Sequence, residues 1–243
     1  MKHLVEICTD TLKSVENAII GGSQRIELCS VLECGGITPS YGFTKKVAEL
    51  NKIKVNILIR PRPGNFVYSD DEFKIMCEDI KQFKELNING IVSGVLTKEG
   101  TVDIEKTKIL VELSKPLEFT FHRAFDNCKN INHAIDEVIE TGANRLLTSG
   151  GKASVDESKD TIIKLHKKYG NRITIMPGGG INLDNAAFFI ENGIKEIHLS
   201  AGSFEKDNTY YNNELAGMGN SVKDGEIGYK YSNIEVIKGV CDL

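Results

Sequence analysis

Eight short apolar runs recur along the chain, and each leads into a stretch with the residue spacing of a helix. Strand and helix signals that alternate in this way predict parallel βα units. Eight such units with right-handed crossovers close most naturally into a barrel. The length of 243 residues is close to the roughly 250 of one TIM barrel. We therefore expect an α/β protein with a single (β/α)8 barrel domain over residues 1–243.

The helical stretches should form the outer layer of this barrel. The third is the clearest, because Ser69 and Glu72 have the spacing of a capping box ahead of an apolar helical pattern. The strand-like runs Gly90–Leu96 and Asn144–Thr148 leave their inward parity ambiguous. The expected helices cover Leu12–Ile20, Phe43–Leu50, Asp70–Leu86, Ile104–Leu113, Ile131–Thr141, Val155–Tyr169, Leu183–Asn192 and Asn233–Val240.

The segment Ser203–Tyr231 interrupts the alternation. It is rich in Asn, Gly, Asp and Tyr and has 29 residues, whereas a loop between a strand and its helix usually has about 2–6. We expect it to be a long loop over the barrel mouth, between the eighth strand and the last helix.

Ionisable residues share one parity near the downstream ends of the apolar runs. In Leu4–Cys8, for example, Val5 and Ile7 alternate with Glu6 and Cys8, and alternate residues of a strand point to opposite faces. Since all strands of a barrel end at the same face, the polar side chains of several runs should meet there. Buried charges cost several kcal/mol unless they are paired, so this concentration favours a binding or catalytic site over a packed core.

Six residues of the expected mouth are candidates for acid–base chemistry. His122 or His198 would act as general base, and Arg60 would hold an anionic group. The residues predicted for the reacting centre are Glu6, Glu27, Arg60, His122, Asp126 and His198. This set is consistent with an enzyme that acts on a small anionic or phosphorylated substrate.

Glycine loops follow three consecutive strand-like runs, at Thr148–Gly151, Met176–Asn182 and Ser200–Gly202. Glycines let backbone N–H groups approach an anion, and the loops after strands seven and eight are the usual phosphate seat of this architecture. We expect an anion between Gly150, Gly179 and Gly202, within reach of Arg60. The predicted anion-binding residues are Arg62, Ser149, Gly150, Gly178, Gly179, Gly180, Ala201 and Gly202.

Cys8 and Cys29 are expected to face inward at equivalent heights on neighbouring strands. Two thiolates a few ångströms apart suit a soft ion such as Cu(I), and Zn²⁺ is a competitor because His or Glu could add ligands. The alternative is two packed thiols in a reducing cell, and the residues alone leave both interpretations open.

Composition limits the kinds of partner. The net charge of −4 and the pI near 5.8 argue against a nucleic acid or an anionic membrane surface. No apolar run approaches the roughly 20 residues needed to span a bilayer, and the start of the chain lacks an apolar targeting core. The six cysteines are scattered without a CxxC pair. These features predict a cytoplasmic protein without a disulfide framework.

Longer motifs mark the strand ends: Glu6-Ile7-Cys8, Arg25-Ile26-Glu27-Leu28-Cys29-Ser30, Ile59-Arg60-Pro61-Arg62, Phe119-Thr120-Phe121-His122-Arg123-Ala124-Phe125-Asp126, Met176-Pro177-Gly178-Gly179-Gly180 and Glu196-Ile197-His198-Leu199-Ser200-Ala201. Together they resemble the CutC family, named for copper homeostasis, over most of residues 1–204. The resemblance implies a cytoplasmic TIM barrel that binds copper and forms a homo-oligomer, a dimer or a tetramer.

Carried over by position, the pair that would hold Cu(I) falls on Cys8 and Cys29. The mouth residues shared with the family fall on the six acid–base candidates. The chain departs from the family at Pro63, where a glycine is usual, and at Asn65, where an aspartate is usual. Copper homeostasis with Cu(I) bound at the mouth is our first hypothesis, and the enzyme is the second.

Overall fold

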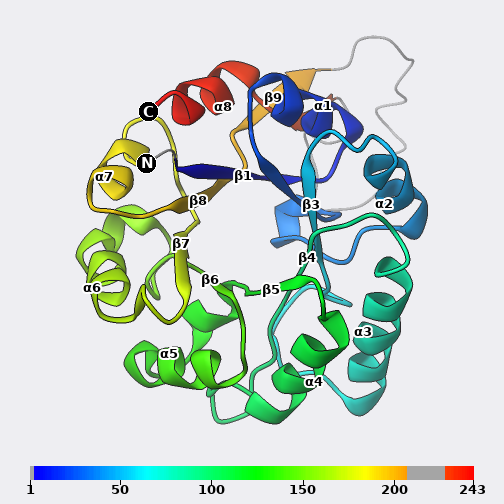
Figure 1. Cartoon of the computed structure of the whole chain (residues 1–243), viewed down its shortest axis with the longest axis vertical. Helices are drawn as coiled ribbons and strands as arrows, with labels where there is room; N and C mark the ends of the chain where they lie inside the picture. Colours follow the sequence, from blue (N-terminus) through cyan, green and yellow to red (C-terminus); the bar gives the residue numbers. More distant parts are fainter. Residues whose placement is uncertain (1–2, 207–227) are drawn as a thin grey trace, which may run out of the picture.

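The computed structural model describes residues 3–206 and 228–243. In this part of the chain, eight parallel strands form one sheet in the order β7-β6-β5-β4-β3-β2-β1-β8. A further parallel bridge between Gly178 and His198 links β8 to the end of β7, so the sheet closes on itself (Figure 1). The strands are β1 Leu4–Thr9, β2 Arg25–Leu28, β3 Lys54–Leu58, β4 Gly90–Ser93, β5 Glu118–Phe121, β6 Arg145–Thr148, β7 Thr174–Pro177 and β8 Glu196–Leu199. The predicted (β/α)8 barrel is confirmed.

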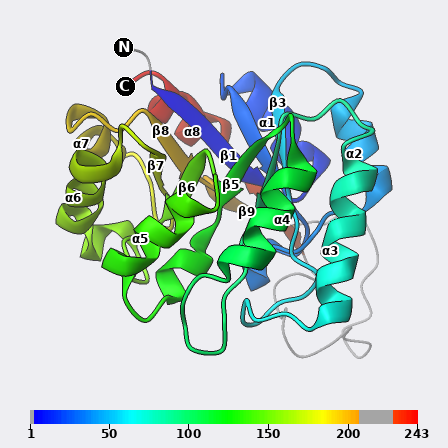
Figure 2. The same ribbon diagram turned by 60° about the horizontal axis from the view of Figure 1, so that its bottom comes forward.

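The helices surround the strands, as Figures 1 and 2 show. They are α1 Leu12–Ile20, α2 Tyr41–Ala48, α3 Asp70–Phe83, α4 Ile104–Ser114, α5 Ile131–Glu140, α6 Lys159–Tyr169, α7 Ala186–Glu191 and α8 Ile234–Cys241. The capping box at the start of α3 is present, since Ser69 and Glu72 each accept a hydrogen bond from the other's backbone N–H. No helix in residues 3–206 and 228–243 has the length and apolar character required to cross a bilayer.

Two expected helices begin later than predicted. The stretch Val155–Tyr169 is divided into a 3-10 turn, Val155–Glu157, and α6. The helix expected at residue 183 begins instead at Ala186, because the side chain of Asn182 accepts the N–H groups of the residues two and three positions later. Such side-chain acceptors stabilise a turn in competition with the helix.

Strand parity sorts the barrel side chains into two layers. Val5 and Ile7 of β1 are fully buried and belong to the same apolar cluster as Val15 of α1, so they face the helices. On the opposite face, Glu6 of β1 accepts a hydrogen bond of 3.1 Å from Asn56 of β3. A contact between strands that are not neighbours places this second layer inside the barrel.

The segment predicted as a long loop is partly a β-ribbon. β9, Gly202–Lys206, pairs antiparallel with β10, Gly228–Ser232, and residues 207–227 lie outside the described residues. The ribbon lies against α1, where Asn17 donates a 2.8 Å hydrogen bond to the carbonyl of Ser232 and Lys13 pairs with Glu205. The prediction of a loop was therefore wrong for residues 203–206 and 228–231. Pairing between the two strands orders them, and the local composition does not indicate such pairing.

Candidate functional site

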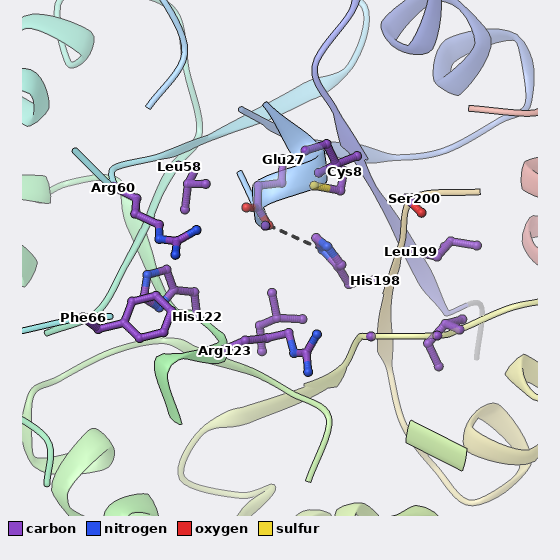
Figure 3. A pocket seen from close by; sticks show the side chains of 16 residues that line it. Cys8, Glu27, Leu58, Arg60, Phe66, His122, Arg123, His198, Leu199 and Ser200 are labelled. Atoms are coloured by element: carbon purple, nitrogen blue, oxygen red, sulfur yellow. Dashed lines mark ion pairs between the residues drawn. The ribbon is translucent and has the colours of Figure 1, made fainter. Parts of the chain in front are cut away.

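A cavity of about 270 Å³ opens at the end of the barrel where the strands finish. Figure 3 shows Cys8, Glu27 and His198 grouped on one side, with Arg60, His122 and Phe66 on another. The lining residues come from β1, β2, β3, β6 and β8 and from the segments that follow β2, β3, β5, β7 and β8. The lining residues are Cys8, Glu27, Leu32, Gly35, Leu58, Arg60, Phe66, His122, Arg123, Leu147, Gly179, Gly180, Ile181, His198, Leu199 and Ser200.

Three of the predicted residues form a compact cluster. One potential ligand atom from each of Cys8, Glu27 and His198 lies within 4.8 Å of the others, and all three residues are buried. β-sheet register explains the cluster, because Cys8 is paired with Glu27 across β1 and β2, and His198 is paired with Glu6 across β1 and β8. Thiol, carboxyl and imidazole groups in this arrangement can bind a metal ion or transfer a proton.

Glu6 lies beneath the cavity and does not line it. Burial alone would raise the pKa of its carboxyl, but the charges of Arg25 and His198 and a 2.8 Å hydrogen bond with His198 Nδ1 outweigh burial and lower the pKa to about 2. Burial would lower the pKa of His198, yet the same hydrogen bond and the charge of Glu27 raise it. The pair therefore holds the ring of His198 in one orientation, with Nδ1 toward Glu6.

Glu27 carries a carboxyl group whose pKa lies near neutral pH. Burial and the charge of Glu6, offset in part by His198, raise its pKa to about 7. Its Oε2 is buried, has no hydrogen-bond partner in the described part of the chain and lies 3.6 Å from His198 Nδ1. An unpaired buried oxygen beside a cavity is an acceptor available to a proton or a ligand.

The two thiols are close, although not at equal heights. Cys8 is level with Glu27. Cys29 lies two residues after Glu27, just beyond the end of β2, and reaches Cys8 diagonally, with 3.9 Å between the sulfurs. Cys29 is fully buried and does not line the cavity, and its Sγ is 3.5 Å from the carbonyl oxygen of Thr9. The sulfur contact with Cys29, together with burial, raises the pKa of Cys8 well above its usual range. Without a metal ion, Cys8 is a thiol at neutral pH.

Arg60 is held by backbone carbonyls. Its guanidinium donates to the carbonyls of Cys34, Gly36 and Gly64 at 2.8–3.0 Å, and it lies 4.9 Å from the ring of Phe66. Within residues 3–206 and 228–243, no carboxylate lies within ion-pair distance of it. Carbonyl oxygens satisfy N–H groups without neutralising the charge, so a buried positive charge faces the cavity.

His122 lies beside Arg60 in the cavity wall. Burial, reinforced by the positive charge of Arg60, lowers the pKa of its imidazole to about 3. Its Nδ1 accepts the N–H of Ala124 at 3.3 Å, which places the proton of the neutral ring on Nε2. Nε2 has no partner among the described residues. His122 is thus neutral at physiological pH, with one N–H available.

Asp126 has a positioning role rather than a place in the cavity. It accepts hydrogen bonds from the N–H groups of Ser149 and Gly151 and from the hydroxyls of Thr148 and Ser149, at 2.5–2.9 Å. It also pairs with Arg123 Nε at 2.9 Å. These contacts fix the loop after β6 and orient Arg123, which lines the cavity.

The predicted anion seat is only partly assembled. Gly179 and Gly180 line the cavity with Arg60, whereas Gly150 lies in an outer hollow and Gly202 in a neighbouring one. Ser149, Gly178 and Ala201 do not line it, and Gly178 instead bridges to His198. Arg62 points elsewhere and pairs with Glu72.

An ionic network beneath the site, buried except at Glu118, was missed. Arg25 pairs with Glu6 and Glu196, and Arg145 pairs with Glu196 and, at 2.9 Å, with Glu118. A signal was available, because Arg25 and Glu196 stand two residues before Glu27 and His198 and so share their inward parity. The cavity residue Phe66 lies in a loop without such periodicity.

Comparison with known proteins gives a consistent assignment. The model of the CutC family matches residues 3–203. A CutC protein of Vibrio vulnificus strain CMCP6 is 44% identical over 206 residues, 84% of this chain and 82% of the relative. A CutC protein of Parabacteroides distasonis is 40% identical over 240 residues, 98% of this chain and 99% of the relative. A solved CutC structure from Streptococcus agalactiae, provisionally named for copper homeostasis, has a TM-score of 0.77 at 35% identity and covers 82% of this chain and 98% of its own. The chain with this barrel and this cavity belongs to the CutC family.

Proposed function

We propose that the protein binds copper as Cu(I) at the barrel mouth, with Cys8 and Cys29 as the principal ligands and copper as cargo. The observation that carries the proposal is the 3.9 Å separation of the two sulfurs beside the cluster of Cys8, Glu27 and His198. Thiolates are the ligands that select Cu(I), and hard ions such as Mg²⁺ and Ca²⁺ require oxygen ligands instead. The name of the Streptococcus agalactiae relative, which refers to copper homeostasis, agrees with this cargo.

The neighbouring residues suit such a site. His198 is oriented by Glu6 through Nδ1, as ligand histidines are oriented by carboxylates, and its Nε2 could supply a third ligand. Binding displaces the protons of the thiols. Glu27, whose pKa is raised to about 7 by burial, lies within 4.8 Å of Cys8 and can accept one of them.

The test is a Cu(I) titration under reducing, oxygen-free conditions against a chromophoric Cu(I) chelator. Loss of one of two thiolate ligands should weaken binding at least a hundredfold in Cys8→Ser and in Cys29→Ser, as thiolate is replaced by a poor ligand. Cys77→Ser is the matched control, because this partly buried cysteine lies on α3, away from the cavity. Equal affinities for wild type and both mouth variants would refute the proposal, and a preference for Zn²⁺ would identify a different cargo.

A second candidate function is acid–base catalysis, which the poised carboxyl of Glu27 favours. A general acid or base works best when its pKa is near the working pH, and burial raises the pKa of Glu27 to about 7. Carbon-13 NMR of the glutamate carboxyl groups, with Glu27→Gln for assignment, would measure this titration. A Glu27 carboxyl that titrates near 4.5 would remove the support for this function.

Location and assembly stay predictions. The scattered cysteines without a CxxC pair suit the reducing cytoplasm. Light scattering of the purified protein would distinguish a dimer or tetramer from a monomer.

A further inference from the structure

We infer that the cavity contains a second subsite, which binds the oxyanion of a small molecule, a phosphate or a carboxylate, opposite the thiols. It is formed by Arg60, Arg123 and the backbone N–H groups of Gly180 and Ile181. The inference goes beyond copper binding and adds a substrate class to the second candidate function, acid–base catalysis. It rests on that function only for the role of the bound anion as part of a substrate.

The charge of Arg60 is the first reason. Its side chain is 5% exposed, and no acid of residues 3–206 and 228–243 forms an ion pair with it. Three carbonyls hold its guanidinium in place, so its geometry is fixed before any ligand binds. A buried, immobilised and unneutralised cation costs free energy that an anion in the cavity recovers.

Arg123 supplies a second set of donors. Asp126 and Ser149 bind its Nε and Nη2 at 2.9 and 2.7 Å, which leaves Nη1 without a hydrogen bond among the described residues. Nη1 lies beside Gly179, where a Cβ would be 2.8 Å from it. Gly179 has φ +100°, a conformation that favours glycine. The glycine therefore makes room for the arginine at the cavity wall.

Backbone donors complete the subsite. Gly180 and Ile181 line the cavity, and their N–H groups donate no hydrogen bond within the described part of the chain. The carbonyl of Gly180 is directed elsewhere, since it accepts from Asn182 and Asn185. Ile181 is buried and Gly180 is exposed at the rim of the cavity. An oxyanion is the partner that suits both N–H groups and the two arginines.

The subsite is distinct from the thiol group in position and in chemistry. Figure 3 shows Arg60 and Arg123 apart from Cys8, with Glu27 and His198 between Cys8 and the two arginines. A ligand anchored by its oxyanion would present its remaining atoms to Glu27 and His198. The ligand class is a small phosphate ester or carboxylate that fits about 270 Å³.

The test is calorimetric titration of the full-length protein with inorganic phosphate, glycerol phosphate and succinate as separate probes. We expect at least one to bind, and the preferred probe identifies phosphate or carboxylate as the source. Arg123→Gln removes a charged donor without touching the carbonyl cage of Arg60 and should weaken binding about tenfold or more. Arg60→Gln should do the same, and its melting temperature shows whether the loops around Cys34, Gly36 and Gly64 still fold.

Arg62→Gln is the matched control, because Arg62 pairs with Glu72 and does not line the cavity. It should leave the affinity unchanged. The inference is overturned if none of the three probes binds wild type, or if Arg62→Gln weakens binding as much as Arg123→Gln. The Cu(I) titration separates the proposals: Cys8→Ser should retain oxyanion binding, and Arg123→Gln should retain Cu(I) binding.

Discussion

Two histidines of the cavity, His122 and His198, respond in opposite ways to burial in the same barrel. His198 hydrogen-bonds Glu6 and lies near Glu27, and these acids raise its pKa against the effect of burial. Among the described residues, no acid opposes the effect of burial on His122, and the charge of Arg60 lowers its pKa further, to about 3. Side-chain neighbours, rather than residue type, therefore decide which ring carries a charge.

The neutral state of His122 predicts a pH-dependent stability. Its pKa is about 3 in the folded protein and about 6.5 when unfolded. Below pH 6.5 the unfolded state binds the extra proton, so the free energy of unfolding should fall as pH decreases from 6.5 toward 3, by up to about 1.4 kcal/mol per pH unit. His122→Asn keeps an acceptor for the Ala124 N–H and should flatten this dependence.

Urea unfolding at several pH values between 4 and 7 measures the effect. His133→Asn is the control, since His133 is exposed on α5. Identical slopes for wild type and His122→Asn would show that His122 is protonated in the folded protein.

At the scale of elements, side-chain size inside the barrel limits how closely neighbouring strands can approach one another. Gly90 begins β4 and is paired with Asn56 of β3 and Glu118 of β5. A Cβ at position 90 would lie 2.5 Å from Asn56 Oδ1 and 3.0 Å from the backbone oxygen of Glu118. Because one of these atoms belongs to the backbone, β4 can approach both neighbours only without a side chain at this position.

Gly90→Ala should therefore destabilise the protein by about 1–3 kcal/mol, as overpacking does in other cores. The matched substitution is Gly42→Ala in α2, where a Cβ would meet nothing within 4 Å. It should change stability by no more than about 1 kcal/mol, in the stabilising direction, because alanine favours a helix. Chemical denaturation of the two variants compares them directly. A Gly90→Ala protein as stable as Gly42→Ala would contradict the close packing of β3, β4 and β5.

At the scale of the whole molecule, a network of ion pairs crosses the barrel at the end where the strands begin. Arg25 of β2 joins Glu6 of β1 to Glu196 of β8, and Arg145 of β6 continues from Glu196 to Glu118 of β5. The network thus links five strands from both halves of the chain. Removing one partner of a buried pair leaves an uncompensated charge, which is more harmful than losing an exposed pair.

Arg25→Met should lower the free energy of unfolding by about 3–5 kcal/mol, because it leaves Glu6 buried without its main cation. Adding Glu6→Gln should recover part of this loss, since it removes the unpaired charge. Lys74→Met breaks the exposed pair with Asp71 and should cost less than about 1 kcal/mol. Equilibrium denaturation measures the free energy of unfolding of each variant. Equal losses of this free energy for Arg25→Met and Lys74→Met would contradict a structural role for the network.

The local pattern of the sequence determined the barrel and the inward face of its strands. Alternation with period two separated Val5 and Ile7 from Glu6 and Cys8, and the structure has the same division. Such signals are local, since each depends only on a few consecutive residues and on burial of one face. For the same reason, the sequence could identify Glu27, Arg60, His122 and His198 as residues of the mouth, and all four line the cavity.

Only the tertiary structure decided which of these residues meet. Register between β1 and β2 places Cys8 beside Glu27, with Cys29 reached diagonally. Loop packing directs Arg62 to Glu72 and brings Arg123, held by Asp126, to the cavity wall. These outcomes depend on the closure of the sheet and on contacts between residues far apart in the chain, and no local period of the sequence records either.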